Sequence, residues 1–214
     1  MFIDLVDALR CPRPHDATWL VAAALETRGR CLVRGTLGCP VCEAEFAIAG
    51  GVALFDGAGD APRAADATSP AGDPAELAMR LAALLDLTTP GGIVAVGGAW
   101  EPALDPLLDV TDLHALVVEP VGQWVPREPF GAMRGDGLPV AAGALRGVAL
   151  DARTASADRV AAAVRALRPR GRLVAPAATP VPDGVRELAR DERHWVGERG
   201  AGVISETIPL RRRR

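Results

Sequence analysis

From residue 75 onward, short apolar runs of strand length alternate with amphipathic stretches of helix length, and this alternation constrains the fold most. Strands are predicted at residues 93–96, 115–119, 147–150 and 172–176. Helical spacing of apolar residues occurs at 76–87, 157–167 and 185–190. We expect residues 194–198 and 203–210 to close the sheet as an antiparallel pair. Strands and helices in alternation favour an α/β fold with a doubly wound, mostly parallel, Rossmann-like sheet.

Composition divides the chain into parts. Residues 1–56 contain all four cysteines, which indicates a small separate module. Residues 57–74 are rich in Gly, Ala, Asp and Pro without apolar periodicity, which is typical of a linker. The α/β module then occupies residues 75–210, and residues 211–214 form a basic tail of four arginines.

Net charge and hydropathy restrict the functional classes. A formal charge of −3 gives no general attraction to nucleic acid or anionic membranes, and a short basic tail is usually solvated. No segment approaches the ~20 apolar residues of a membrane span. The N-terminal stretch carries acids where a signal peptide carries positive charge, so a cytoplasmic location is expected. In that reducing compartment, four cysteines favour a metal site or free thiols over disulfides.

Two cysteine clusters frame the first module. The Cys39-Pro-Val-Cys42 turn directs two sulfurs to one point, which is typical of a zinc knuckle. Cys11 is the natural third ligand. For the fourth we favour His15 over its rival Cys31, since Cys31 lies in an apparent strand, where a small buried thiol is common. The predicted ion is structural zinc, whose binding would largely fold this module.

The stretches LVDALRCP and LGCPVCEAEFAIAGGVALF resemble the small zinc-ribbon family that partners and activates tRNA and translation-factor methyltransferases. The sequence departs from the family at the first knuckle, where the family's second cysteine falls at Pro14, one place before His15. The resemblance implies a protein partner, either a methyltransferase or a translation-related protein. A homo-oligomer is the alternative.

Residues 161–177 (AAAVRALRPRGRLVAPA) and 134–150 (RGDGLPVAAGALRGVAL) resemble class I S-adenosylmethionine-dependent methyltransferases of the ubiquinone- and menaquinone-biosynthesis type. The resemblance implies that S-adenosylmethionine is the cofactor. It places Glu119 at the ribose hydroxyls and Asp136 at the adenine amino group. The cofactor-facing loop would be formed by Gly97, Gly98 and Ala99.

This loop is degraded relative to the family pattern. Ala99 and Glu101 stand where the second and third glycines belong, and Ala95 stands where an acid is usual. Trp100 adds a large side chain beside the expected cofactor space. Residues 121–135 contain two prolines, so the helix that usually follows the second strand is expected to be short or absent.

Two functions follow as hypotheses. We favour a methyltransferase-like protein that no longer uses the cofactor and acts as a scaffold or regulatory partner. The alternative is an active S-adenosylmethionine-dependent methyltransferase with a built-in zinc-ribbon activator, because methyl transfer depends mainly on positioning. No catalytic residue is singled out. Nucleic-acid binding through the arginine tail ranks last because the chain is acidic overall.

Overall fold

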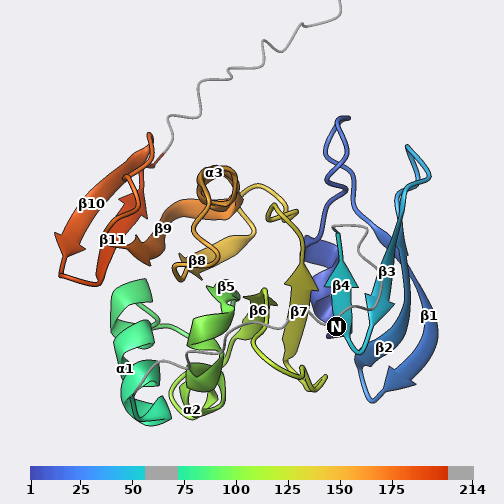
Figure 1. Ribbon diagram of the computed structural model, residues 1–214, viewed down its shortest axis with the longest axis horizontal. Coiled ribbons are helices and arrows are strands. Elements are labelled where there is room, and N and C mark those ends of the chain that lie inside the picture. Colours follow the sequence, from blue (N-terminus) through green and yellow to red (C-terminus); the bar gives the residue numbers. More distant parts are fainter. Residues whose placement is uncertain (56–71, 202–214) are drawn as a thin grey trace, which may run out of the picture.

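The computed structural model describes residues 1–55 and 72–201. Their strands form one eleven-stranded sheet in the order β1-β2-β3-β4-β7-β6-β5-β8-β9-β11-β10 (Figure 1). The N-terminal strands lie at one end of the sheet and the C-terminal hairpin lies at the other. Within these residues, none of the helices combines the length and the apolar character that a bilayer span demands.

The N-terminal part is an antiparallel meander preceded by a short 3-10 helix. Its elements are η1 (Ile3–Ala8), β1 (Val21–Arg28), β2 (Cys31–Gly38), β3 (Glu45–Ala49) and β4 (Val52–Leu54). The β3–β4 turn consists of Gly50 and Gly51, both with positive φ, which is the conformation that a two-residue hairpin requires.

The second part contains the parallel strands. They are β5 (Ile93–Gly97), β6 (His114–Val118), β7 (Phe130–Arg134), β8 (Leu145–Ala149) and β9 (Leu167–Pro176). The antiparallel hairpin β10 (Val185–Arg190) and β11 (His194–Arg199) follows. Numbered within this part, the order is 3-2-1-4-5-7-6, so its first five strands keep the Rossmann order.

Helices cover both faces of this parallel sheet. They are α1 (Pro74–Leu85), the 3-10 helix η2 (Gly98–Ala103), α2 (Leu104–Leu108) and α3 (Ala157–Ala166). Side chains alternate along each strand, so Val94 and Val96 pack in the core with α1 and α2, whereas Ala95 packs in the core with α3. The predicted doubly wound, mostly parallel α/β arrangement is therefore confirmed for this part.

The two parts share a continuous sheet because β4 pairs in parallel with β7, with Val52 opposite Ala132. A second backbone contact joins them beside η1, where the Arg10 amide donates to the Pro139 carbonyl. Most of the predicted linker lies outside the described residues, as does the basic tail. The domain boundaries stay a prediction.

Two expectations for the C-terminal region need correction. Residues 185–190 form a strand rather than a helix, because β11 offers an antiparallel partner and tertiary pairing outweighs local helical spacing. The carboxylate of Asp191 accepts hydrogen bonds from the amides of Arg193 and His194, and this turn reverses the chain between the two strands. Strand β11 thus pairs with β10 and β9, whereas residues 203–210 lie outside the described part.

Residues 119–129 contain no helix, as their prolines predict.

Candidate functional sites

The structure brings Cys11, His15, Cys39 and Cys42 together, with their ligand atoms all within 4.8 Å of one another. The Cys11 and Cys42 sulfurs are 3.7 Å apart, and Cys39 Sγ lies 3.4 Å from His15 Nε2. Zinc bonds of about 2.3 Å to sulfur and about 2.0 Å to nitrogen in a tetrahedron imply separations of roughly 3.5–3.8 Å. The cluster is therefore compatible with a zinc ion.

Local structure orients these ligands. Cys39 and Cys42 lie in one tight turn, in which the Glu43 amide donates to the Cys39 carbonyl. His15 Nδ1 lies 2.7 Å from the Asp16 carbonyl oxygen, which can only accept, so Nδ1 carries the proton. That leaves the lone pair of His15 Nε2 directed at the sulfurs, which is the arrangement usual for histidine metal ligands.

The thiols of the cluster differ in acidity. Burial of the Cys39 thiol raises its pKa, but hydrogen bonds from the Cys42 and Val41 amides outweigh this and lower the pKa to about 6. Burial raises the pKa of the Cys11 thiol to about 11. Cys31, the rival fourth ligand, is 1% exposed in β2 and lies in the core outside the cluster.

The glycines at the end of β5 are packed against the protein's own atoms. A Cβ added at Gly97 would lie 2.5 Å from Thr154 Oγ1 and 2.8 Å from Asp151 Oδ2. A Cβ at Gly98 would overlap the Glu119 carbonyl oxygen. Both positions require glycine because the loop after β8 and the tip of β6 approach the backbone closely.

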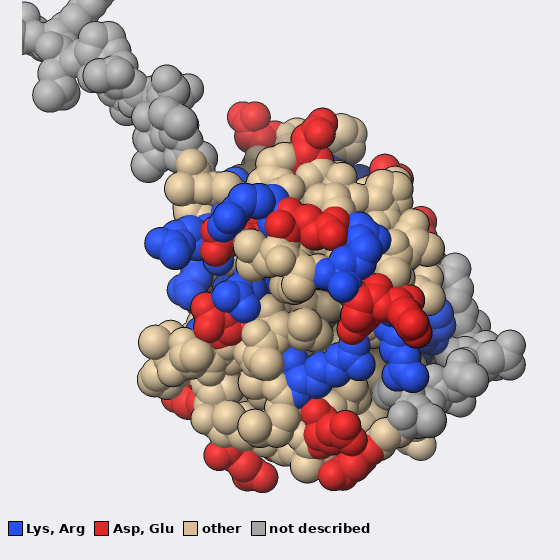
Figure 2. Space-filling model, turned by 90° about the vertical axis from the view of Figure 1, so that its left-hand side faces the viewer, with Lys and Arg blue, Asp and Glu red and all other residues tan. Residues whose placement is uncertain are grey.

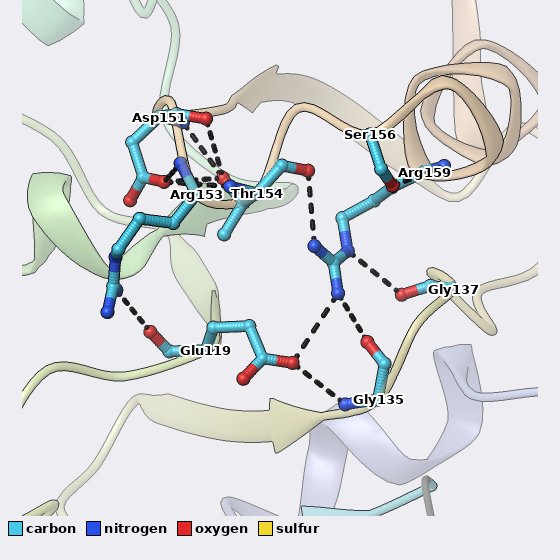
Figure 3. A network of polar contacts seen from close by, with 8 residues as sticks. All are labelled: Glu119, Gly135, Gly137, Asp151, Arg153, Thr154, Ser156 and Arg159. Carbon is cyan, nitrogen blue, oxygen red and sulfur yellow. Dashed lines mark hydrogen bonds and ion pairs between the residues drawn. The ribbon is translucent and has the colours of Figure 1, made fainter. Parts of the chain in front are cut away.

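Asp151 ties the loop after β8 to the loop after β5; its contacts within its own loop are seen in Figure 3. Its Oδ2 accepts a hydrogen bond of 2.9 Å from the Ala99 amide. Its Oδ1 accepts from the amides of Arg153 and Thr154 and from the Thr154 hydroxyl. Asp151 is only 7% exposed, so these bonds replace water in solvating its carboxylate.

Glu119 directly follows β6 and has a positive φ of 54°. Its Oε1 accepts a hydrogen bond of 2.9 Å from the Gly135 amide, and its carbonyl accepts one of 3.0 Å from the Arg153 guanidinium. The acid predicted to hold the ribose is therefore engaged by the neighbouring strand tip.

Arg159 is the group that sequence reasoning missed. Its guanidinium, on α3, donates to the carbonyls of Gly135, Gly137 and Thr154 and forms an ion pair of 3.4 Å with Glu119 (Figure 3). The residue is only 5% exposed. One side chain thereby joins the loops that follow β6, β7 and β8. The sequence could have indicated this role, because Arg159 falls on the apolar face of the helix at residues 157–167. An arginine that is buried there must find several hydrogen-bond acceptors.

The remaining predicted residues lie at the margins of this network. Asp136 is exposed at the end of β7, between the two glycines that Arg159 contacts. Trp100 is turned into the core and is 3% exposed, with its Nε1 facing the Leu150 carbonyl. The space beside Gly97 and Gly98 is consequently taken by the loop after β8 rather than by Trp100.

Comparisons with known proteins concern the fold. Neither protein-family models nor curated protein sequences gave a match. One chain of the complex between the Haloferax volcanii Trm112 methyltransferase activator and a candidate methyltransferase is 13% identical, with a TM-score of 0.45 over 59% of this chain and 90% of that chain. The antibiotic-resistance methyltransferase Kmr is 18% identical, with a TM-score of 0.39 over 58% and 93% of the two chains.

MycE, a methyltransferase from the mycinamycin pathway in complex with Mg and SAH, is 13% identical, with a TM-score of 0.43 over 60% of this chain and 49% of its own. At these identities the likeness concerns the fold alone. The fold class is inferred from the strand order of the sheet. The chain has an α/β fold with a Rossmann-like sheet, preceded by a small module whose Cys/His cluster is compatible with zinc.

Proposed function

We propose that this methyltransferase-like protein does not bind S-adenosylmethionine for catalysis and serves as a scaffold or regulatory partner of another protein. The observation that carries the proposal is the buried guanidinium of Arg159, bonded to the loops that follow β6, β7 and β8. Ligands of such sheets bind beyond the carboxyl ends of the strands. Here the space beyond β6 and β7 holds the side chains of Glu119 and Arg159.

An adenosyl ligand would meet two obstacles at the strand tips. It would need bare backbone beside Gly97 and Gly98, where Asp151, Thr154 and Glu119 already make close contacts. It would also compete for the Glu119 carboxylate, whose Oε1 already accepts two hydrogen bonds, so that Oε2 is the remaining acceptor. Breaking a buried, paired arginine away from its partners costs about 3–5 kcal/mol. Binding that requires this opening is weakened by roughly 150- to 5,000-fold.

Isothermal titration with S-adenosylmethionine and with its demethylated product tests the proposal. We expect no saturable heat at ligand concentrations up to about 0.1 mM, because a micromolar intrinsic affinity would be shifted to roughly 0.15–5 mM. Micromolar binding by the wild-type chain that disappears in Glu119→Ala would refute it. Glu187→Ala, on the distant strand β10, is the matched control.

For the N-terminal part we propose one structural zinc ion held by Cys11, His15, Cys39 and Cys42. The ligand separations and the orientation of the His15 ring support it. Elemental analysis should find about one zinc per chain, since a four-ligand site is complete without solvent. Cys31→Ser should keep the ion and Cys39→Ser should lose it. A zinc-free wild-type protein contradicts this assignment.

The alternative function is an active S-adenosylmethionine-dependent methyltransferase whose fused zinc-ribbon module acts as a built-in activator. One observation favours it: the Glu119 side chain remains 19% exposed, so one face of the strand tips is reachable from solvent. Saturable cofactor binding together with transfer of a labelled methyl group to a protein or small-molecule acceptor would establish this alternative over the scaffold.

A further inference from the structure

A cavity of about 330 Å³ lies beside the strand-tip network, at the carboxyl ends of β5, β8 and β9. The first turns of α1 and the β10–β11 turn complete its walls. Its apolar lining includes Leu77, Trp100 and Pro176. This volume suits a small organic ligand, and an apolar lining with few polar groups is usual for such sites.

A second cavity of about 440 Å³ adjoins the first, because Ala152 and Pro176 line both. Its other walls are α3 and residues 178–182, and nearly all its lining side chains are Ala, Val or Pro. An apolar group bound in the first cavity therefore has an apolar extension available. The two cavities together offer a charged end and an apolar end.

The charges around the first cavity are of both signs. Asp73, Asp151 and Arg80 are occupied, since Asp73 caps α1 by accepting from the Ala75 amide, Asp151 accepts from backbone amides and Arg80 pairs with Asp191 at 2.8 Å. Among the described residues, the side chains of Glu76 and Arg193 form no hydrogen bond or ion pair. Both are exposed and line the cavity, one from α1 and the other from the β10–β11 turn.

His194 adds no net charge to this wall at neutral pH. Burial lowers its pKa, and the nearby Arg80 guanidinium lowers it further. Figure 2 shows this end of the molecule, formed by α1, β10 and β11, with acidic and basic side chains interspersed rather than gathered by sign. One available acid and one available base match a ligand that carries one ammonium and one carboxylate.

We propose that the first cavity binds a free α-amino acid with an unbranched or aromatic apolar side chain. The ammonium is held by Glu76 and the carboxylate by Arg193, and the side chain lies on Leu77, Trp100 and Pro176 and extends toward Ala152. No cofactor takes part, so this site does not depend on whether the protein binds S-adenosylmethionine.

A homologous ligand series tests the proposal. Isothermal titration of the full chain with glycine, L-2-aminobutyrate, L-norleucine and L-2-aminooctanoate should show affinity rising about threefold to fourfold per buried methylene, because each transfers from water to the apolar walls. The N-acetyl and methyl-ester forms of L-norleucine each lack one charge and should bind at least tenfold more weakly. Equal affinity across the series, or for the blocked forms, refutes the assignment, as does absence of binding.

Three variants locate the site. Glu76→Gln and Arg193→Gln remove the two charges at exposed positions, so the fold should persist, and each should weaken L-norleucine binding at least fivefold. Arg186→Gln, an exposed arginine of β10 outside the cavity, should leave binding unchanged. If Glu76→Gln and Arg193→Gln bind as the wild type does, the site is wrong. Cofactor titrations on the same samples decide the proposed function separately.

Discussion

Replacing Arg159 by alanine should destabilise the fold by about 3 kcal/mol. The side chain donates to three carbonyls and one carboxylate, and hydrogen bonds to charged groups contribute ~1.5–3 kcal/mol each before rehydration is counted. Water can reach the Glu119 carboxylate, which is 19% exposed, so part of this loss is recovered. The lower end of the range for breaking a buried ion pair, about 3–5 kcal/mol, is therefore expected.

Urea unfolding followed by tryptophan fluorescence measures this difference, with a melting-temperature shift of roughly 6–12 °C as the thermal equivalent. The matched control is Arg186→Ala, whose ion pair with Glu198 involves an arginine side chain that is 73% exposed and should contribute about 0–1 kcal/mol. A loss for Arg159→Ala no larger than that of the control would show that the guanidinium does not hold the strand tips together.

Three further predictions concern other parts of the structure. Gly98→Ala places a Cβ on the Glu119 carbonyl oxygen and should cost about 1–3 kcal/mol in urea unfolding, whereas Gly137→Ala, where nothing lies within 4 Å, should not. Chelation of zinc should release the N-terminal module, seen as lost amide-exchange protection in residues 1–55 with later strands less affected. Burial raises the pKa of Glu101, so the protonated form is favoured in the folded state and stability should fall as pH rises from the ordinary carboxyl range through the raised value. Glu101→Gln should remove this fall in urea unfolding measured across a pH series, and an unchanged pH profile would contradict it.

Much of the parallel sheet could be predicted from sequence because its strands are buried on both faces. Such strands appear as continuous apolar runs, as at residues 93–97 and 114–118. The Cys/His cluster could also be predicted from the sequence, because the Cys-Pro-x-Cys turn places two sulfurs close together. His15 followed from its short spacing to Cys11.

Other features depend on contacts that sequence patterns do not encode. Strand β10 has a helical spacing of apolar residues, but its pairing with β11 decides its conformation. The pairing of β4 with β7 joins segments distant in sequence and leaves no local signal. The role of Gly97 and Gly98 was also ambiguous, because glycine is required whether a ligand or the chain's own loop approaches the backbone.

The parallel pairing of β4 with β7 also sets an order for synthesis. Val52 and Ala132 are roughly eighty residues apart, so a chain emerging from the ribosome completes its first four strands long before their neighbour exists. During that interval β4 presents an unsatisfied row of amides and carbonyls to other nascent chains. Slow translation before residue 134 should therefore increase co-translational aggregation, and a chaperone that shields strand edges should suppress it.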